Sequence, residues 1–103
     1  MGEEPTTARA ARIEVGQRSV RALANHLQGE HLPRRPDWDC LTCDPSTPWP
    51  CDPARVRLAE MYEEHDNRIG LSMYMGSLLH AALEEMPDTP ANELHERFVA
   101  WTR

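Results

Sequence analysis

Residues 31–51 read HLPRRPDWDCLTCDPSTPWPC, and this segment decides how the chain folds. The histidine is followed after eight residues by Cys40, after two more by Cys43, and after a further seven by Cys51. In a Cys-x-x-Cys pair a tight turn directs both sulfurs toward one ion, with backbone amides nearby to bond the thiolates. This spacing is typical of a structural zinc site. We therefore predict that the three cysteines are zinc ligands.

Zinc needs a fourth donor, and we expect His31, because it lies at the other end of the loop from Cys51 and closes it. His65 is the next candidate and His80 follows, since helices packed over the loop can bring either side chain to the site. We expect the remaining two histidines, His26 and His95, to face solvent or the core. Four protein donors leave no position for a reactive water, so the predicted zinc is structural rather than catalytic.

Other roles for the three cysteines fit the sequence less well than zinc binding does. Free cysteine is often buried as a small apolar residue, but these three lie together in a polar segment rich in proline. We expect a cytoplasmic protein, and disulfides are rare in that reducing compartment; an odd number of cysteines also leaves one unpaired. An iron–sulfur cluster would use the same thiolates, but such clusters usually take four cysteines. Zinc is therefore the preferred cofactor.

The length of 103 residues allows one domain, which we take as residues 1–103. A domain of this size buries only about two-thirds of the surface of its unfolded chain, so its core is small. Three tryptophans, two tyrosines and one phenylalanine give that core few large side chains. A bound metal would compensate for part of the deficit.

Outside the loop the sequence predicts an all-α fold of three to four helices, with no strand signal. We expect residues 1–5 to form a disordered tail, Thr6 or Thr7 to cap the first helix, and that helix to end near Gly29. Residues 30–52 then form the zinc-binding loop between the first and second helices. Residues 53–103 form the remaining helical part.

Two pairs of residues mark helix starts in this later part. Asp52 before Pro53 and Thr89 before Pro90 each place a capping side chain ahead of a proline. No proline interrupts residues 54–86, so one long helix or two helices joined near residues 67–70 both fit. Apolar residues recur there at helical spacing, and we expect them to face the core: Leu58, Tyr62, Ile69, Met73, Leu79, Leu83 and Met86.

Trp38 and Trp49 flank the cysteines in the sequence. We expect both rings to cover the metal site and to attach the loop to the helices. The alternative is an exposed aromatic surface for a partner, because tryptophan is common at binding hot spots.

Charge and hydropathy exclude two classes of partner. The formal net charge is −6, and residues 36–103 carry thirteen acidic residues against five arginines. Binding to nucleic acid relies on several basic groups that displace counterions from phosphates, so we do not expect it here. No apolar stretch is long enough to span a bilayer, and the first residues lack the apolar core of a secretion signal.

Residues 31–103 resemble a group of small actinobacterial proteins with the successive motifs His-x-Pro, Trp-x-Cys-x-x-Cys, Pro-Trp-Pro-Cys and Ala-Arg. The segment LHERFVAWTR at 94–103 is similar to the group's closing Leu-x-x-Arg-Phe-x-x-Trp-x-Arg element. The resemblance implies that His31, Cys40, Cys43 and Cys51 act together. Members are often labelled flavin reductases, but this chain has no glycine-rich phosphate loop.

The sequence thus favours a non-enzymatic, zinc-stabilised helical module that binds another protein, and it leaves a homo-oligomer possible. One alternative is a small flavin-dependent reductase. The other is an iron–sulfur redox sensor, since the chain also resembles actinobacterial regulators related to sporulation factors, although it lacks their fourth cysteine.

Overall fold

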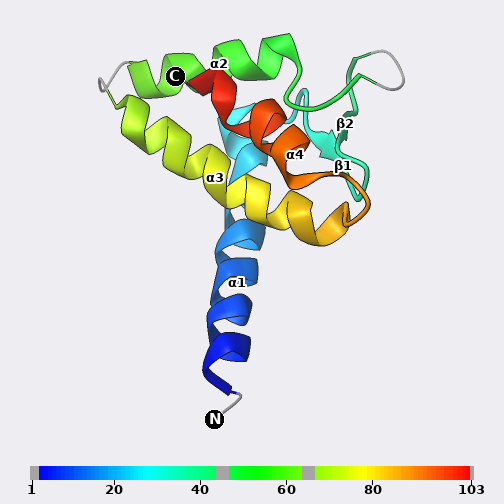
Figure 1. Cartoon of the computed structure of the whole chain (residues 1–103). Helices are drawn as coiled ribbons and strands as arrows, with labels where there is room; N and C mark the ends of the chain where they lie inside the picture. Colours follow the sequence, from blue (N-terminus) through cyan, green and yellow to red (C-terminus); the bar gives the residue numbers. More distant parts are fainter. Residues whose placement is uncertain (1–2, 44–46, 64–66, 103) are drawn as a thin grey trace.

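The computed structural model describes residues 3–43, 47–63 and 67–102. Within these ranges the chain is mostly helical, which confirms the predicted helical class. The helices are α1 (Glu3–His26), α2 (Asp52–Glu63), α3 (Arg68–Glu85), α4 (Ala91–Phe98) and the short 3₁₀ helix η1 (Ala100–Thr102). The segment that contains the cysteines lies between α1 and α2 (Figure 1).

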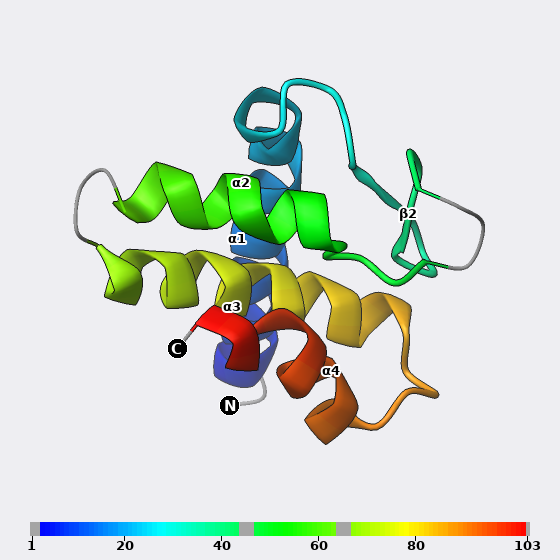
Figure 2. The ribbon, with the colours of Figure 1, turned by 90° about the horizontal axis from the view of Figure 1, so that it is seen from above.

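Helix α3 is the centre of the fold, because α1, α2, α4 and η1 all pack against it. Figure 2 shows α2 and α3 side by side, with α1 seen nearly end-on as it crosses them. Each of the four α-helices contributes fully buried side chains to one core, including Leu23 of α1, Leu58 of α2, Leu78 of α3 and Phe98 of α4.

The crossing of α1 over α3 explains a glycine in the middle of α1. A Cβ atom at Gly16 would lie 3.1 Å from the Ser77 carbonyl oxygen and 3.2 Å from the Ala81 Cβ. Next to this contact the Tyr74 hydroxyl donates to the Ser19 carbonyl at 2.6 Å. Glycine costs a helix about 1 kcal/mol relative to alanine, and here it permits the close approach of two backbones.

The first helix begins earlier than the sequence indicated. We expected a disordered tail at residues 1–5 and a cap at Thr6 or Thr7, but α1 already begins at Glu3 and runs through both threonines. The sequence is compatible with this start, because Pro5 lies in the first turn, where its missing N–H costs no helical hydrogen bond. Figure 1 shows this end of α1 extending beyond the other elements.

Residues 54–86 form two helices rather than one. α2 ends at Glu63, and α3 begins after Asn67, whose side chain accepts a hydrogen bond from the Gly70 N–H at 2.9 Å. The break resets the helical phase, so the expectation that Ile69 and Met73 face the core was wrong: they are 76 % and 71 % exposed. The core face of α3 instead carries Leu71, Met75, Leu78, Ala81 and Ala82.

The expected helix caps were also wrong in detail. α2 begins at Asp52, and the Cys51 carbonyl accepts from the Arg55 N–H at 3.0 Å, so Cys51 occupies the capping position. α4 begins at Ala91 after Pro90, and no side chain caps it, Thr89 included. The sequence located both starts to within about a residue, which is the usual accuracy of such boundaries.

The loop contains a small hairpin that the sequence did not predict. Strands β1 (Pro33–Arg34) and β2 (Asp39–Cys40) pair antiparallel, with Pro33 opposite Cys40. The Trp38 N–H donates to the Arg34 carbonyl at 2.6 Å across the turn. Two residues per strand are too few to produce an alternating pattern of apolar and polar side chains, which is the signal of a strand.

Candidate metal site

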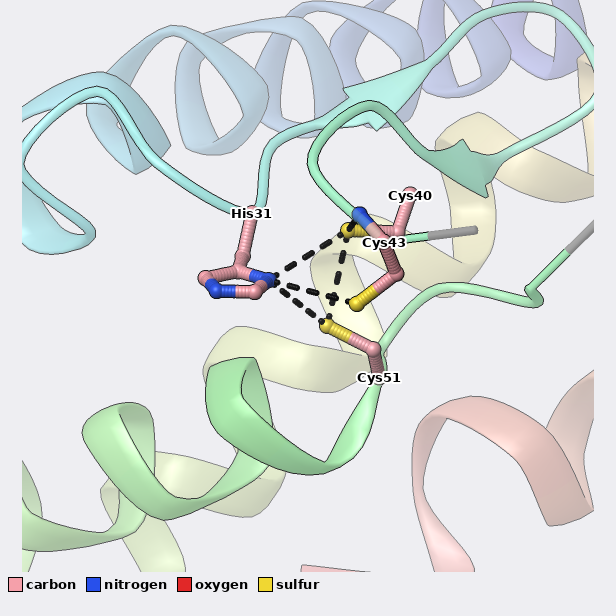
Figure 3. A group of neighbouring side chains, drawn as sticks. All are labelled: His31, Cys40, Cys43 and Cys51. Atoms are coloured by element: carbon pink, nitrogen blue, oxygen red, sulfur yellow. Dashed lines mark hydrogen bonds between the residues drawn. The ribbon is translucent and has the colours of Figure 1, made fainter. Parts of the chain in front are cut away.

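Four side chains from separate parts of the loop converge on one point (Figure 3). His31 follows α1, Cys40 lies on β2, Cys43 lies in the turn after β2, and Cys51 precedes α2. One ligand atom from each residue lies within 4.8 Å of the other three, an arrangement that could hold a metal ion. The four residues are the four candidates identified from the sequence.

The distances between these atoms fit a single tetrahedral ion. His31 Nδ1 lies 3.5 Å from the sulfurs of Cys40 and Cys43 and 3.4 Å from that of Cys51, and the Cys40 and Cys51 sulfurs are 3.6 Å apart. Bond lengths of about 2.3 Å to sulfur and about 2.0 Å to nitrogen give tetrahedral edges of about 3.8 Å between sulfurs and about 3.5 Å from nitrogen to sulfur. These four edges agree with the tetrahedral values to within a few tenths of an ångström, and the Cys43 sulfur lies within 4.8 Å of the other two sulfurs.

The Cys-x-x-Cys turn directs a backbone amide at a sulfur, as expected from its spacing. The Cys43 N–H donates to the Cys40 sulfur at 3.4 Å. Burial works against the Cys40 thiolate, but this amide, the Thr42 amide and His31 outweigh it and lower the pKa of Cys40 to about 7. Cys40 is thus prepared to bind as a thiolate near neutral pH.

Cys51 shows the opposite behaviour. Burial, together with the adjacent sulfurs of Cys40 and Cys43, raises the pKa of Cys51 to about 12 against the opposing effect of the Ala54 amide. Sulfurs this close disfavour one another's ionisation, because each thiolate repels the next. A bound cation reverses that preference, since it stabilises every thiolate around it.

The main chain of His31 forms hydrogen bonds with two other parts of the loop. Its N–H donates to the Thr42 hydroxyl at 2.8 Å, and its carbonyl accepts from the Trp49 indole N–H at 2.7 Å. His31 also has a positive φ of 54°, a conformation uncommon in residues other than glycine. The surrounding contacts therefore determine where the imidazole points.

Trp38 and Trp49 join the loop to the helices, which excludes the exposed aromatic surface considered above. Both are 0 % exposed. Their ring centroids lie 5.2 and 6.0 Å from that of Phe98 on α4 and 5.8 Å from each other. Aromatic contacts of this kind add about 0.5–1.5 kcal/mol each beyond the area they bury.

Sequence reasoning missed the charged residues that hold this loop. Glu85, at the end of α3, accepts from Arg35 Nε at 2.8 Å and from the Trp38 indole N–H at 3.0 Å. Arg97 of α4 donates to main-chain carbonyls of the loop. No spacing rule links these residues to the cysteines. The sequence offers one hint, for Arg97 alone: it adjoins Phe98 in the segment at 94–103 that resembles the end of the actinobacterial proteins.

The other histidines do not join the cluster within the described ranges. His80 is exposed on α3, His95 lies on α4, and the His26 ring packs edge-on against Tyr74 at 5.4 Å. His65, the second candidate, lies outside the described residues. His31 is therefore the histidine that the structure places beside the three sulfurs.

None of the helices in the described parts of the chain is both long and apolar enough to cross a membrane. In comparisons with known proteins, no family model, no curated protein and no solved structure matches the chain.

Proposed function

We propose that this protein is a zinc-stabilised helical module, in which His31, Cys40, Cys43 and Cys51 bind one structural zinc ion. The convergence of one nitrogen and three sulfurs at tetrahedral distances carries the proposal. In the cytoplasm, where we place the protein, its thiols stay reduced and available as ligands.

Zinc is favoured over the other metals that bind cysteine. Three thiolates and one imidazole form a common structural zinc set, and zinc prefers the tetrahedral geometry that these atoms approach. A cluster whose cysteines bind different iron atoms spreads its ligand atoms more widely than a single ion does. Donors within 4.8 Å of one another therefore argue for one ion rather than an iron–sulfur cluster.

The flavin-dependent alternative has little support among the described residues. A partly enclosed hollow beside Tyr62, Arg68 and Trp101 has a volume of about 110 Å³, whereas pockets for ligands of drug size usually measure about 300–1,000 Å³. A wider surface hollow is lined by the carboxylates of Asp37, Glu85 and Asp88 and by one guanidinium, that of Arg97. Because its acidic groups outnumber its single cation, the hollow disfavours the phosphate of a flavin nucleotide.

Two features support the proposal that the module binds another protein. With all four positions filled by protein atoms, the zinc has no place for a substrate or a reactive water. Ile69 and Met73 lie one turn apart on α3 and are largely exposed, and apolar side chains grouped on a surface are common where proteins bind one another. The module is thus proposed as an accessory protein rather than an enzyme.

Metal analysis of protein purified without oxygen or chelators tests this function. We expect one equivalent of zinc per chain and a colourless protein. Absorbance at visible wavelengths from a bound flavin would favour the reductase, and a brown protein with iron and sulfide would favour the redox sensor. Either result, or protein free of metal, would overturn the zinc proposal.

A further inference from the structure

One arginine of α4 donates hydrogen bonds to two separate segments of the candidate metal loop, the one before Cys40 and the one before Cys51. Arg97 Nε donates to the Trp49 carbonyl at 2.6 Å, and its Nη2 donates to the Trp38 carbonyl. Trp38 lies two residues before Cys40, and Trp49 lies two residues before Cys51. A single guanidinium therefore bridges the two chain segments that carry ligands.

These two segments also bond each other at the same point. The Trp49 N–H donates to the Trp38 carbonyl at 2.8 Å, so that carbonyl accepts from both Trp49 and Arg97. Trp38 has a positive φ of 58°, which a residue with a side chain maintains only when its surroundings enforce it. The hydrogen bond from Arg97 is one such constraint, and it acts on Trp38, two residues before the predicted ligand Cys40.

The chemistry of this contact requires arginine. Bonds from a charged donor to a carbonyl are stronger than those between neutral groups. The planar guanidinium presents several N–H groups in a fixed fork, so it can reach two carbonyls at once, whereas lysine offers a single flexible ammonium. Arg97 is half-buried beside Phe98, whose ring packs on both tryptophans, so little freedom is left to its side chain.

We propose that Arg97 is the positioning residue of the metal site: it holds the Cys40 and Cys51 segments at the separation that a tetrahedral ion requires. This inference rests on the proposed zinc function and deepens it, because it makes zinc affinity depend on α4. In other metal sites, residues that orient the ligands without touching the metal have a similar effect. Their loss typically weakens metal binding about 10- to 100-fold.

The test compares zinc affinity in Arg97→Lys and in the unmodified protein, by competition with a chromogenic chelator, together with the visible spectrum of the cobalt(II) form. We expect Arg97→Lys to bind zinc about 10- to 100-fold more weakly. Its cobalt spectrum should also change, because the ligands no longer hold the same tetrahedral geometry.

Two further variants serve as controls. Arg57→Lys makes the same chemical change at an exposed position of α2. Leu71→Val weakens the core on α3, about four turns and roughly 21 Å along the helix from Glu85, which contacts the loop. Both should keep the affinity and cobalt spectrum of the unmodified protein, so a change confined to Arg97→Lys is not a general effect of lost stability.

The outcomes separate this inference from the function on which it rests. If Arg97→Lys binds zinc as tightly as the unmodified protein and with the same cobalt spectrum, Arg97 does not position the site, and the zinc proposal stands. If the unmodified protein binds no zinc, both proposals fail.

If Arg97→Lys does not fold, hydrogen exchange in the unmodified protein decides the question. The comparison is between the zinc form and the form with the larger ion cadmium(II), because both ions fill the site and keep the fold. Coupling between two sites is reciprocal, so a change in the separation of the Cys40 and Cys51 segments should alter exchange in α4 more than in residues 10–22 of α1. Identical exchange in α4 of the two forms would contradict the inference.

Discussion

His31 meets the three sulfurs through its side chain, while its backbone is bonded by Thr42 and Trp49. These two roles can be separated, because an alanine at this position keeps the backbone bonds and removes only the imidazole. The fourth ligand can therefore be tested without disturbing the path of the loop.

We predict that His31→Ala releases zinc readily to a chromogenic chelator, because three sulfurs alone leave the tetrahedral site incomplete. His80→Ala is the matched control, since His80 is exposed on α3 and should retain zinc like the unmodified protein. Equal retention by the two variants would show that His31 is not a ligand.

The pKa values of the cysteines predict how zinc binding depends on pH. Zinc binds thiolates, so any ligand that is protonated before binding must release its proton, and lower pH weakens binding. Cys51, with a pKa raised to about 12, releases a proton at every pH from 8 to 6. Cys40, with a pKa lowered to about 7, is mostly a thiolate at pH 8 and mostly protonated at pH 6.

The zinc affinity should therefore fall as the pH decreases from 8 to 6, and the fall should become steeper below about pH 7 as Cys40 gains its proton. Chelator competition across this range, corrected for protonation of the chelator, measures it. An affinity independent of pH would contradict thiolate ligation.

At the level of elements, the contact of α1 with α3 depends on the absence of a side chain at Gly16. The atoms that a Cβ at this position would meet belong partly to the backbone of α3, which cannot move aside like a flexible side chain. A glycine on the open face of α3 provides the comparison, because a Cβ at Gly76 would meet nothing within 4 Å.

We predict that Gly16→Val lowers the free energy of unfolding by about 1–3 kcal/mol through overpacking. Gly76→Ala should raise it by about 0.5–1 kcal/mol, because alanine favours the helix and no atom opposes it. Denaturant unfolding of the zinc-loaded protein measures both. A stabilising Gly16→Val would mean that α1 does not cross α3 as closely as described.

Sequence patterns predicted some elements well for identifiable reasons. The spacing of the cysteines and the place of His31 at the other end of the loop identified the four clustered residues, because these residues lie close together in the chain. The phase of α3 was mispredicted at Ile69 and Met73, because apolar spacing alone does not reveal at which residue the second helix begins, and both a continuous and a divided helix fitted the sequence. Contacts such as Arg97 with Trp38 join residues far apart in sequence, and no local pattern signals them.

For the whole molecule, the proposed zinc supplies stability that the small core lacks. Structural zinc contributes about 10–16 kcal/mol in small zinc-binding peptides, as much as the net stability of a typical domain. The loop lies between α1 and α2, and its two tryptophans belong to the same core as the helices. Loss of the ion should therefore affect the helices as well as the loop.

We predict that removing zinc lowers the helical circular-dichroism signal or broadens the unfolding transition. Cys40→Ser and Cys43→Ser should do the same, because a hydroxyl is a poor zinc ligand. If metal-free protein keeps full helicity and the same unfolding temperature, zinc does not hold the fold, and a sensing or catalytic role for the loop becomes the better explanation.

The central claim is that one zinc ion joins four residues of a single chain, and native mass spectrometry tests it most directly. Protein purified without chelator or oxidant should show the mass of the chain plus one zinc per copy. Under denaturing conditions the same sample should show all three cysteines reduced. A native mass that matches the metal-free chain, or one that matches a chain with a disulfide between Cys40 and Cys51, would contradict the account.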